Sequence, residues 1–294
     1  MFRTKADLLA LANRYANERR VPFSTIIKEI LHYEILYAMA QSEALSQLTF
    51  QGGTALRLCY RGTRYSEDLD FACSESFHTD AMQPFAELLQ KEIAAAYDLD
   101  VEIKKPKFNG QRTAGVSVAR WSAKILVPQT DPSVPQNQVI NIEVANVRAY
   151  EPDLVAVNAN YPHLPAPLQQ MIIATETPTE ILADKIVALG ARPYLKARDV
   201  WDIKFLLDRQ TVPDFKLVQK KLTDYGWTAD AFKSKMSEKI ELLAQPDTAN
   251  HFYAEMSRFV DATVLPQLKN PSMANMFLRK SIELGQQTIA ANLG

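Results

Sequence analysis

Two short features of the sequence have residue types and spacing that suit chemistry on phosphates. The first is the pair Gly52 and Gly53, which follows the apolar run LSQLTFQ in a chain of 294 residues with 9 glycines. Adjacent glycines between a strand and a helix let the backbone approach a bulky anion, and the N–H groups of the next helical turn then point at that anion. Thr54 adds a hydroxyl group. The pattern predicts a phosphate-binding loop.

The second feature is the acidic cluster that ends at Asp70. In the predicted strand EDLDFAC, Asp68 and Asp70 lie on one face, because side chains alternate along a strand. Two neighbouring carboxylates raise each other's pKa unless a cation lies between them. Mg²⁺ suits this arrangement, since it binds one or two carboxylates together with substrate phosphates. The sequence therefore predicts a magnesium site.

A third carboxylate would complete a two-metal site, which holds the attacking and leaving oxygens of an in-line displacement at phosphorus. Glu143 is our candidate, because the strand NIEVANV places it on one face with Asn141. Glu102 is the alternative, in a strand whose alternation is weaker. Each feature alone has a simpler reading, as a turn, a solvated strand end or a solvent-facing glutamate. Their order along the chain favours one shared site.

The composition argues against several other classes of function. The 33 Lys and Arg residues balance the 34 Asp and Glu residues, so bulk charge predicts no nucleic-acid coat. Two cysteines, Cys59 and Cys73, are too few for a disulfide framework and favour a reducing cytosol. Neither a secretory leader nor a membrane span is expected. The motifs GxxxxGK[ST], HExxH, GxSxG and GxGxxG are absent from the sequence.

The predicted elements place these residues on an α/β (α+β) fold with a mixed sheet and a helical C-terminal part. Apolar spacings of three and four predict helices over 5–20, 24–43 and 81–97, and alternation predicts strands within 101–108, 115–127 and 139–147. The proline-rich stretch 152–167 is predicted to connect a domain over 1–165 to one over 166–294. The second domain begins its helices at the capping box TPTE, residues 177–180, and its first helix is expected to stop at Gly190.

The run GGTALRLCYRGTRYSEDLDF resembles the signature of polymerase-β-like nucleotidyltransferases, a GG or GS followed by DxD. In detail the chain is similar to the AbiEii-type nucleotidyltransferase toxins. The shared features are the GGTAL start, an Arg-x-Ser-x-Asp-x-Asp core, and a helical pair that here reads EILADKIVALGAR and KARDVWDIKFLL. The resemblance implies a bilobed protein, with a nucleotidyltransferase lobe and a helical lobe, that transfers nucleotides from an NTP with the help of Mg²⁺.

The resemblance also assigns residues to roles. Gly52, Gly53 and Thr54 match the phosphate loop, and Asp68 and Asp70 match the metal ligands, to which Glu143 would be added. Lys185 and Asp199 match the functional residues of the helical motifs, and Lys185 would neutralise charge on the triphosphate. Without the resemblance, Lys185 would be read as a solvated side chain, and Arg198 with Asp202 as an i,i+4 pair. Nucleotide binding is expected at Gly52, Gly53, Thr54, Arg64, Ser66 and Lys185.

The family implies a toxin of a type IV toxin–antitoxin system, active in the cytoplasm and associated with phage defence. Its acceptor would be RNA, with the tRNA acceptor end as the first expectation, so that extension blocks translation. A cognate antitoxin encoded beside the toxin is the expected partner. Two alternatives stay open: transfer to a protein hydroxyl or a small molecule, and a catalytically silent nucleotide-binding module. The candidate RNA-binding clusters are Arg19, Arg20 and Lys28; Lys104, Lys105 and Lys107; and Lys220 with Lys221.

Overall fold

The structure is a computed structural model that describes residues 4–42, 44–73, 82–106, 116–128 and 136–293. The chain divides into two compact units. The first contains the described residues of 1–61, 65–111 and 117–175, and the second those of 62–64, 112–116 and 176–294. The first unit thus continues to Thr175, whereas the predicted boundary follows residue 165. No helix among the described residues is both long and apolar enough to cross a bilayer.

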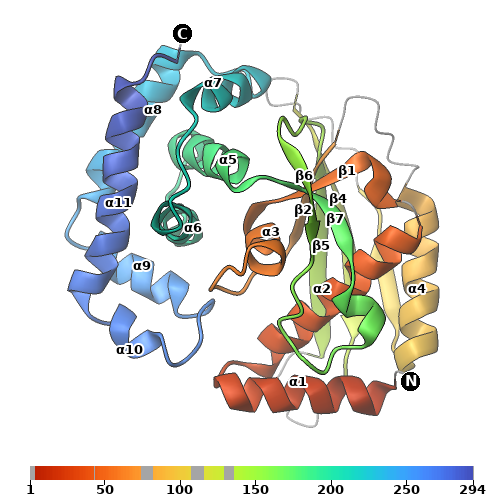
Figure 1. Cartoon of the computed structure of the whole chain (residues 1–294). Helices are drawn as coiled ribbons and strands as arrows, with labels where there is room; N and C mark the ends of the chain where they lie inside the picture. Colours follow the sequence, from red (N-terminus) through yellow and green to blue (C-terminus); the bar gives the residue numbers. More distant parts are fainter. Residues whose placement is uncertain (1–3, 43, 74–81, 107–115, 129–135, 294) are drawn as a thin grey trace. The chain divides into compact units, whose positions relative to one another are not determined.

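The first unit is built on a mixed, seven-stranded sheet with the strand order β3-β4-β5-β2-β1-β7-β6 (Figure 1). Strand β2 pairs in parallel with β5, and β1 with β7, while the pairs β1–β2, β3–β4 and β4–β5 are antiparallel. This confirms the predicted mixed α/β fold. The strands are β1 (Leu48–Gln51), β2 (Leu69–Cys73), β3 (Val101–Lys104), β4 (Val118–Leu126), β5 (Asn137–Ala145), β6 (Pro152–Ala156) and β7 (Ile172–Glu176).

The described helices of this unit pack mainly through apolar side chains. They are α1 (Lys5–Arg19), α2 (Phe23–Gln41), α3 (Gly52–Cys59) and α4 (Gln83–Tyr97). Helix α1 begins at a capping box, in which the Thr4 hydroxyl accepts from the Asp7 N–H and the Asp7 carboxylate accepts from the Thr4 N–H. Helix α2 packs against α1, α4 and β5, and most of its residues are buried. The apolar residues of α2 that recur at spacings of three and four are buried, and Glu29, His32 and Glu34 are buried with them.

Strand β4 shows why one face of the sheet is left for polar residues. Trp121, Ala123 and Ile125 are buried, while the residues between them point to the other face. The same alternation in β5 buries Ile140 and Ile142. The face opposite these apolar side chains carries most polar residues of the two strands: Arg120, Ser122 and Lys124 of β4, and Asn141 and Glu143 of β5.

The proline-rich stretch 152–167 differs from its predicted role as a connection between domains. Strand β6 lies inside this stretch, at the edge of the sheet, and all of the stretch belongs to the first unit. Pro152 is the first residue of β6, a position where its missing N–H costs no ladder bond. The strand could not be predicted, because prolines usually indicate turns, whereas an edge strand also tolerates proline at its first residue.

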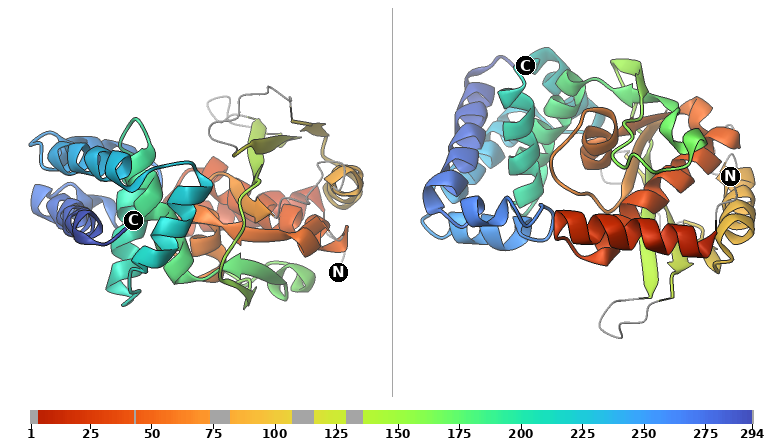
Figure 2. Two further views of the ribbon diagram at one scale, coloured as in Figure 1. Left: turned by 90° about the horizontal axis from the view of Figure 1, so that it is seen from above. Right: turned by 60° about the horizontal axis from the view of Figure 1, so that its bottom comes forward.

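The second unit is helical, as predicted. Its described helices are α5 (Pro178–Ala191), α6 (Ala197–Asp208), α7 (Phe215–Asp224), α8 (Ala229–Leu243), α9 (Thr248–Met256), α10 (Leu265–Leu268) and α11 (Pro271–Ala290). Helix α11, dark blue in Figure 2, runs beside α8 and also contacts α6 and α9. Thr177 caps α5 by accepting from the Glu180 N–H at 3.3 Å, which is the first of the two bonds of the predicted capping box.

Helix α5 does not stop at Gly190 but continues to Ala191. Gly190 has a packing role instead, because a Cβ atom at this position would lie 2.5 Å from the ring of Phe232 on α8. The glycine lets two helices approach closely, which the sequence cannot distinguish from a helix stop.

Lys221 of α7 is buried at the centre of three carboxylates from β7 and α5. Its Nζ lies 3.2 Å from Glu176, 2.8 Å from Glu180 and 2.8 Å from Asp184. This buried contact corrects the expectation that Lys221 belongs to an RNA-binding surface. Burial and the neighbouring Asp184 raise the pKa of Glu176 well above its usual range. Glu176 therefore holds a proton in the folded protein at pH values where the unfolded chain has lost it.

Replacing Glu176 by Gln is expected to remove a pH dependence of folding. The pKa of a glutamate in the unfolded chain is about 4.3. As the pH rises above this value, the free energy of unfolding of the wild type should fall by up to about 1.4 kcal/mol per pH unit. The loss ends at the raised folded pKa, and the Gln side chain does not titrate. Urea unfolding at pH 5 and pH 8 should show that the free energy of unfolding of the variant, relative to that of the wild type, is higher at pH 8 than at pH 5. Glu238→Gln, at an exposed pair with Lys235 on α8, is the control. Equal pH slopes for E176Q and the wild type would contradict the assignment.

Candidate active site

The predicted phosphate loop forms the start of helix α3. Gly52 has φ +77° and follows β1 directly, and Gly53 and Thr54 complete the first turn. Within the described residues, the N-cap residue Gln51 makes no side-chain cap to this turn. The N–H groups of the turn and the positive end of the helix dipole therefore suit an anion.

Gly52 also lies against Asp70 of β2. A Cβ atom added at Gly52 would lie 2.9 Å from Asp70 Oδ2, which is closer than van der Waals contact allows. The register pairs Gln51 with Asp70, so the loop and the carboxylate meet at one place on the sheet. Gly52 is needed both for its backbone conformation and for this approach.

Replacing Gly52 by Ala is expected to displace Asp70. It should also lower the rate of the nucleotidyl transfer that the resemblance implies by about 10²- to 10³-fold, the range for losing one oriented polar group. The positive φ adds about 1–3 kcal/mol of backbone strain. Gly226, with φ 69°, provides a matched control in the turn after α7. Gly226→Ala should be destabilised similarly while its transfer rate stays unchanged. Equal rate losses in the two variants would show that strain alone is responsible.

Asp68 and Asp70 lie close to Asn141 and Glu143. Strand β2 begins at Leu69, so Asp68 immediately precedes the strand rather than lying within it. Asp70 and Glu143 are register partners on the parallel strands β2 and β5. Asn141 Nδ2 donates to Asp68 Oδ1 at 2.9 Å, and Ser122 Oγ donates to Asn141 Oδ1 at 3.2 Å. Asp68, Asp70 and Glu143 therefore share one region of the polar face.

The Thr54 hydroxyl has a structural partner in the same region. It donates to the main-chain carbonyl of Asp68. This bond ties the first turn of α3 to the residue before β2. The predicted phosphate loop and the predicted metal ligands are thus held together by Thr54 and by the contact between Gly52 and Asp70.

The donor set fits Mg²⁺, although within the described part of the chain no three His, Cys, Asp or Glu side chains are placed so that they could together hold a metal ion. Asp68 and Asp70 offer hard carboxylate oxygens, and Mg²⁺ commonly takes one or two of these plus phosphate oxygens. Glu143 has its carboxylate 2.6 Å from Arg120. Glu102 lies on β3, three strands from β2, and therefore cannot replace Glu143. The ligand role of Glu143 stays a prediction.

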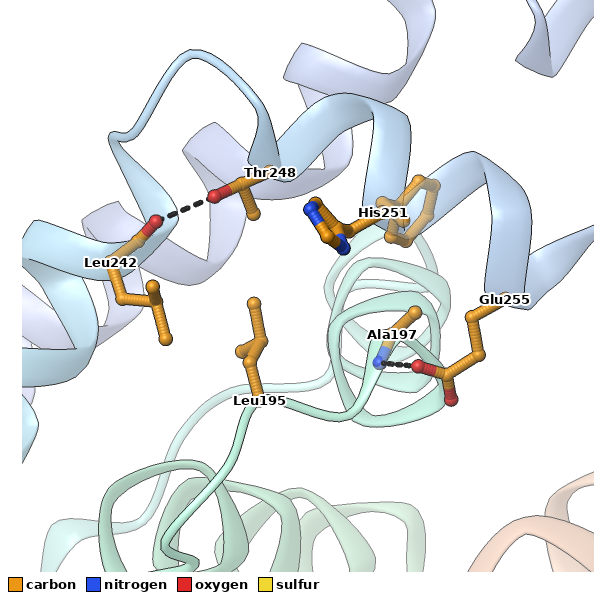
Figure 3. Close-up of a pocket in the computed structure, with 7 residues that line it drawn as sticks. Leu195, Ala197, Leu242, Thr248, His251 and Glu255 are labelled. Carbon is orange, nitrogen blue, oxygen red and sulfur yellow. Dashed lines mark hydrogen bonds between the residues drawn. The ribbon is translucent and has the colours of Figure 1, made fainter.

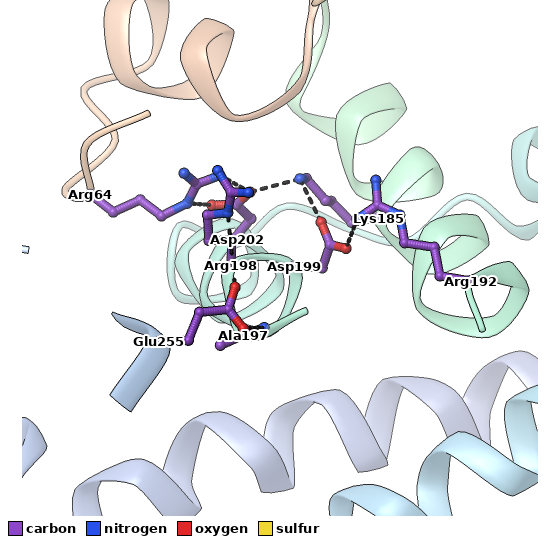
Figure 4. Close-up of polar contacts among 8 residues, drawn as sticks. All are labelled: Arg64, Lys185, Arg192, Ala197, Arg198, Asp199, Asp202 and Glu255. Atoms are coloured by element: carbon purple, nitrogen blue, oxygen red, sulfur yellow. Dashed lines mark hydrogen bonds and ion pairs between the residues drawn. The ribbon is translucent and has the colours of Figure 1, made fainter. Parts of the chain in front are cut away.

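The second unit gathers Arg64, Lys185, Asp199 and Asp202 into a buried ion cluster (Figure 4). Lys185 Nζ lies 2.9 Å from Asp199 and 2.8 Å from Asp202. Arg64 binds Asp202 with two parallel bonds, from Nε at 2.6 Å and from Nη2 at 2.7 Å. Arg192 also contacts Asp199. The structure thus brings Lys185 and Asp199, the two residues that match the helical motifs, into direct contact.

The charges of this cluster support one another. Burial disfavours the charged form of Asp202, but Arg64 and Lys185 outweigh it and lower the pKa of Asp202. Asp199 behaves in the same way, since Lys185 and Arg192 lower its pKa despite burial. Burial alone would lower the pKa of Lys185, but the two carboxylates raise it. Lys185, Asp199 and Asp202 are therefore charged at neutral pH.

Sequence reasoning missed part of this cluster. The spacing in the sequence indicates Asp202 only as a helix partner of Arg198, yet its carboxylate binds Arg64 and Lys185. The available signal was the spacing of Asp199 and Asp202, which places both carboxylates on one side of α6.

Ser66, a predicted nucleotide contact, lies partly exposed in the segment between α3 and β2.

The predicted basic clusters divide into structural and exposed residues. Arg19 stacks over the ring of Tyr161 at 4.6 Å and donates to the Asn160 carbonyl at 2.6 Å, so it holds the fold. Arg20, Lys104, Lys105 and Lys220 are exposed, Lys28 is partly exposed, and Lys107 lies outside the described residues.

A pocket of about 210 Å³ in the second unit is a poor match for the predicted chemistry (Figure 3). Leu195, Leu242 and Phe252 give it apolar walls, and His251 points into it. Its volume is below the 300–1,000 Å³ typical of ligand sites. Glu255 lines it while accepting from the Ala197 N–H at 3.1 Å, which supports the first turn of α6. We assign the pocket no role in catalysis.

Two solved structures from bacteria have a similar fold. MenT4, the nucleotidyltransferase toxin Rv2826c from Mycobacterium tuberculosis H37Rv, matches with a TM-score of 0.59 at 17% identity, over 96% of this chain and 93% of that one. JHP933 from Helicobacter pylori matches with a TM-score of 0.51 at 18% identity, over 92% and 95%. At such identities the similarity establishes the fold. No curated protein sequence matches the chain.

The fold is therefore that of the nucleotidyltransferase toxins. The family model "Nucleotidyl transferase AbiEii toxin, Type IV TA system" matches residues 34–275, which is most of the chain. The protein belongs to the AbiEii family. It is accordingly a nucleotidyltransferase that uses an NTP, and the toxin of a type IV system, whose partner is an antitoxin.

Proposed function

We propose that the protein transfers nucleotides from an NTP to RNA, with the acceptor end of tRNA as its target, in a reaction that depends on Mg²⁺. Extension of that end would prevent aminoacylation and so block translation in the cytoplasm until the antitoxin intervenes. A toxin of this kind would also serve phage defence. Membership of the AbiEii family supports the reaction class, and the polar face of the sheet supports the metal requirement.

The observation that carries the proposal is the meeting of Gly52 with Asp70. The start of helix α3 favours an anion, whereas the nearby carboxylates of Asp68 and Asp70 favour a cation. A divalent cation bound to a triphosphate satisfies both preferences. Asp68 and Asp70 would hold the cation, with Glu143 as the third ligand. When bound, Mg²⁺ would neutralise phosphate charge and stabilise the leaving pyrophosphate.

The residues of the chain have separate tasks in this proposal. The N–H groups of Gly53 and Thr54 would bind the phosphates of the NTP. Ser66, two residues before Asp68, would be a further nucleotide contact. Asn141 orients Asp68 through its hydrogen bond. Lys185 and Arg64 would supply positive charge for the nucleotide, and Asp199 would orient Lys185.

The proposal is tested by incubating the purified protein with Mg²⁺, total tRNA and each α-labelled NTP in turn. RNA and protein are then resolved on separate gels. We expect label in tRNA from one or more NTPs, and no label when EDTA is present. Label in protein without label in RNA would favour the alternative acceptor, a protein hydroxyl.

A further inference from the structure

The polar row on the sheet of the first unit continues past Glu143 to Arg120. The register pairs Gln51 with Asp70, Asp70 with Glu143, and Glu143 with Arg120, across β1, β2, β5 and β4. Residues paired in this way share a face of the sheet. The positively charged side chain of Arg120 therefore lies beside Glu143, the predicted third metal ligand, and two strands from Asp70.

The contact between Arg120 and Glu143 is close but partly exposed. Arg120 Nη2 lies 2.6 Å from Glu143 Oε1, and the two side chains are 61% and 26% exposed. Exposed ion pairs contribute little net stability, because water solvates both partners. The fold therefore does not depend on this pair. Arginine can exchange such a partner for a phosphate, to which its planar fork donates two parallel hydrogen bonds.

We propose that Arg120 binds a phosphate of the RNA acceptor and releases Glu143 when it does so. This inference rests on the proposed function, because it takes RNA as the acceptor. Without RNA, the guanidinium group neutralises Glu143 and competes with a divalent cation for its carboxylate. With RNA bound, a phosphodiester takes over Arg120, and Glu143 is free to bind the cation. The acceptor thereby completes the metal site that acts on it.

Two lysines extend the positive charge from Arg120 along the same face. Lys124 follows Arg120 on β4, and Lys104 is the register partner of Ser122 on β3. Both lie beside Glu102, at 3.9 Å and 3.8 Å; Lys104 is exposed and Lys124 is partly exposed. The polar face is thus basic on the side away from Asp70. A polyanion that approached Asp70 across β3 and β4 would pass Arg120 last.

The metal part of the proposal is tested without RNA or NTP. Mn²⁺ binding to the full chain is measured by calorimetry for the wild type, Arg120→Gln and Arg14→Gln. Arg120→Gln should bind Mn²⁺ about fivefold more tightly, as expected for removing one exposed competing charge. Arg14→Gln is the matched control, because Arg14 and Glu18 form an exposed pair at 2.8 Å on α1. Its affinity should equal that of the wild type.

The RNA part is tested by the salt dependence of tRNA binding, followed by fluorescence anisotropy. Arg120→Gln should weaken binding about fivefold and reduce the slope of log affinity against log salt by roughly 0.7 to 0.9, the value for one phosphate contact. Arg120→Lys should keep most of the slope. Arg14→Gln should change neither quantity. Thermal melting of each variant confirms that it folds.

The outcomes separate this inference from the proposed function. Unchanged Mn²⁺ affinity or an unchanged salt slope in Arg120→Gln would overturn the inference and leave the ion pair as a cross-strand contact. Failure of the wild type to bind or label tRNA would instead contradict the RNA acceptor, while the Mn²⁺ titration would still report whether Arg120 competes at Glu143.

Discussion

Asp70→Asn is expected to reduce nucleotidyl transfer by about a thousandfold or more, which corresponds to the several kcal/mol that a metal ion contributes to phosphoryl chemistry. The substitution keeps the shape of the side chain beside Gly52 and removes its negative charge. A neutral amide is a poor ligand for Mg²⁺, so the defect should lie in the rate and in metal affinity. Asp70 is partly exposed, so the melting temperature should change little.

The control for this prediction is Asp153→Asn, which changes an exposed carboxylate on the edge strand β6, three strands from β2. Its rate should equal that of the wild type. Titrating Mg²⁺ against initial rate measures both variants. A D70N rate within tenfold of the wild type, in a protein that melts normally, would mean that Asp70 does not hold the metal.

Asp202→Ala is expected to destabilise the protein by about 3–5 kcal/mol, the usual result of removing one partner of a buried ion pair. The substitution leaves Arg64 and Lys185 buried without the carboxylate that both of them bind. Buried cations lose their hydration, and Asp199 alone cannot replace two parallel bonds to Arg64. The effect should therefore exceed that of deleting any exposed ion pair.

Urea unfolding at pH 7 measures the loss, with Asp208→Ala as control. Asp208 also pairs with a lysine of α6, Lys204, but its side chain is 51% exposed. Its removal should cost less than about 1 kcal/mol. A loss below 1 kcal/mol for D202A would show that the cluster is not a unit of stability.

The same cluster predicts how stability depends on acid. Asp202 has a lowered pKa in the folded state, so its contribution is complete above the unfolded value of about 3.9 and disappears as the pH falls through the folded value. The wild type should lose stability in that acidic range. D202A should lose less of its remaining stability there.

The sequence was sufficient for the elements whose pattern is local. Helix α2 was predictable from its apolar spacing, and β5 from its alternation. Strand β6 was not, because an edge strand buries little and tolerates Pro152. Gly190 predicts a helix end, but in the structure it allows close contact with Phe232. Both roles favour glycine, so the sequence does not distinguish them.

For the site, spacing within the chain predicted which carboxylates share a face, and the sheet register then placed Glu143 rather than Glu102 beside Asp70. The partners of those residues could not be predicted. Arg120 reaches Glu143 through strand pairing, and Arg64 reaches Asp202 across 138 positions of sequence. Contacts of this kind depend on the tertiary fold, which no local pattern records.

The most direct test of the account is the intact mass of one purified tRNA before and after incubation with the protein, Mg²⁺ and all four NTPs, with D70N in parallel. We predict that the wild type increases the tRNA mass by one or more nucleoside monophosphates at the 3′ end and that D70N leaves it unchanged. An unchanged tRNA mass, together with a nucleotide added to protein, would contradict an RNA acceptor. The same mass gain with D70N would contradict the carboxylate site itself.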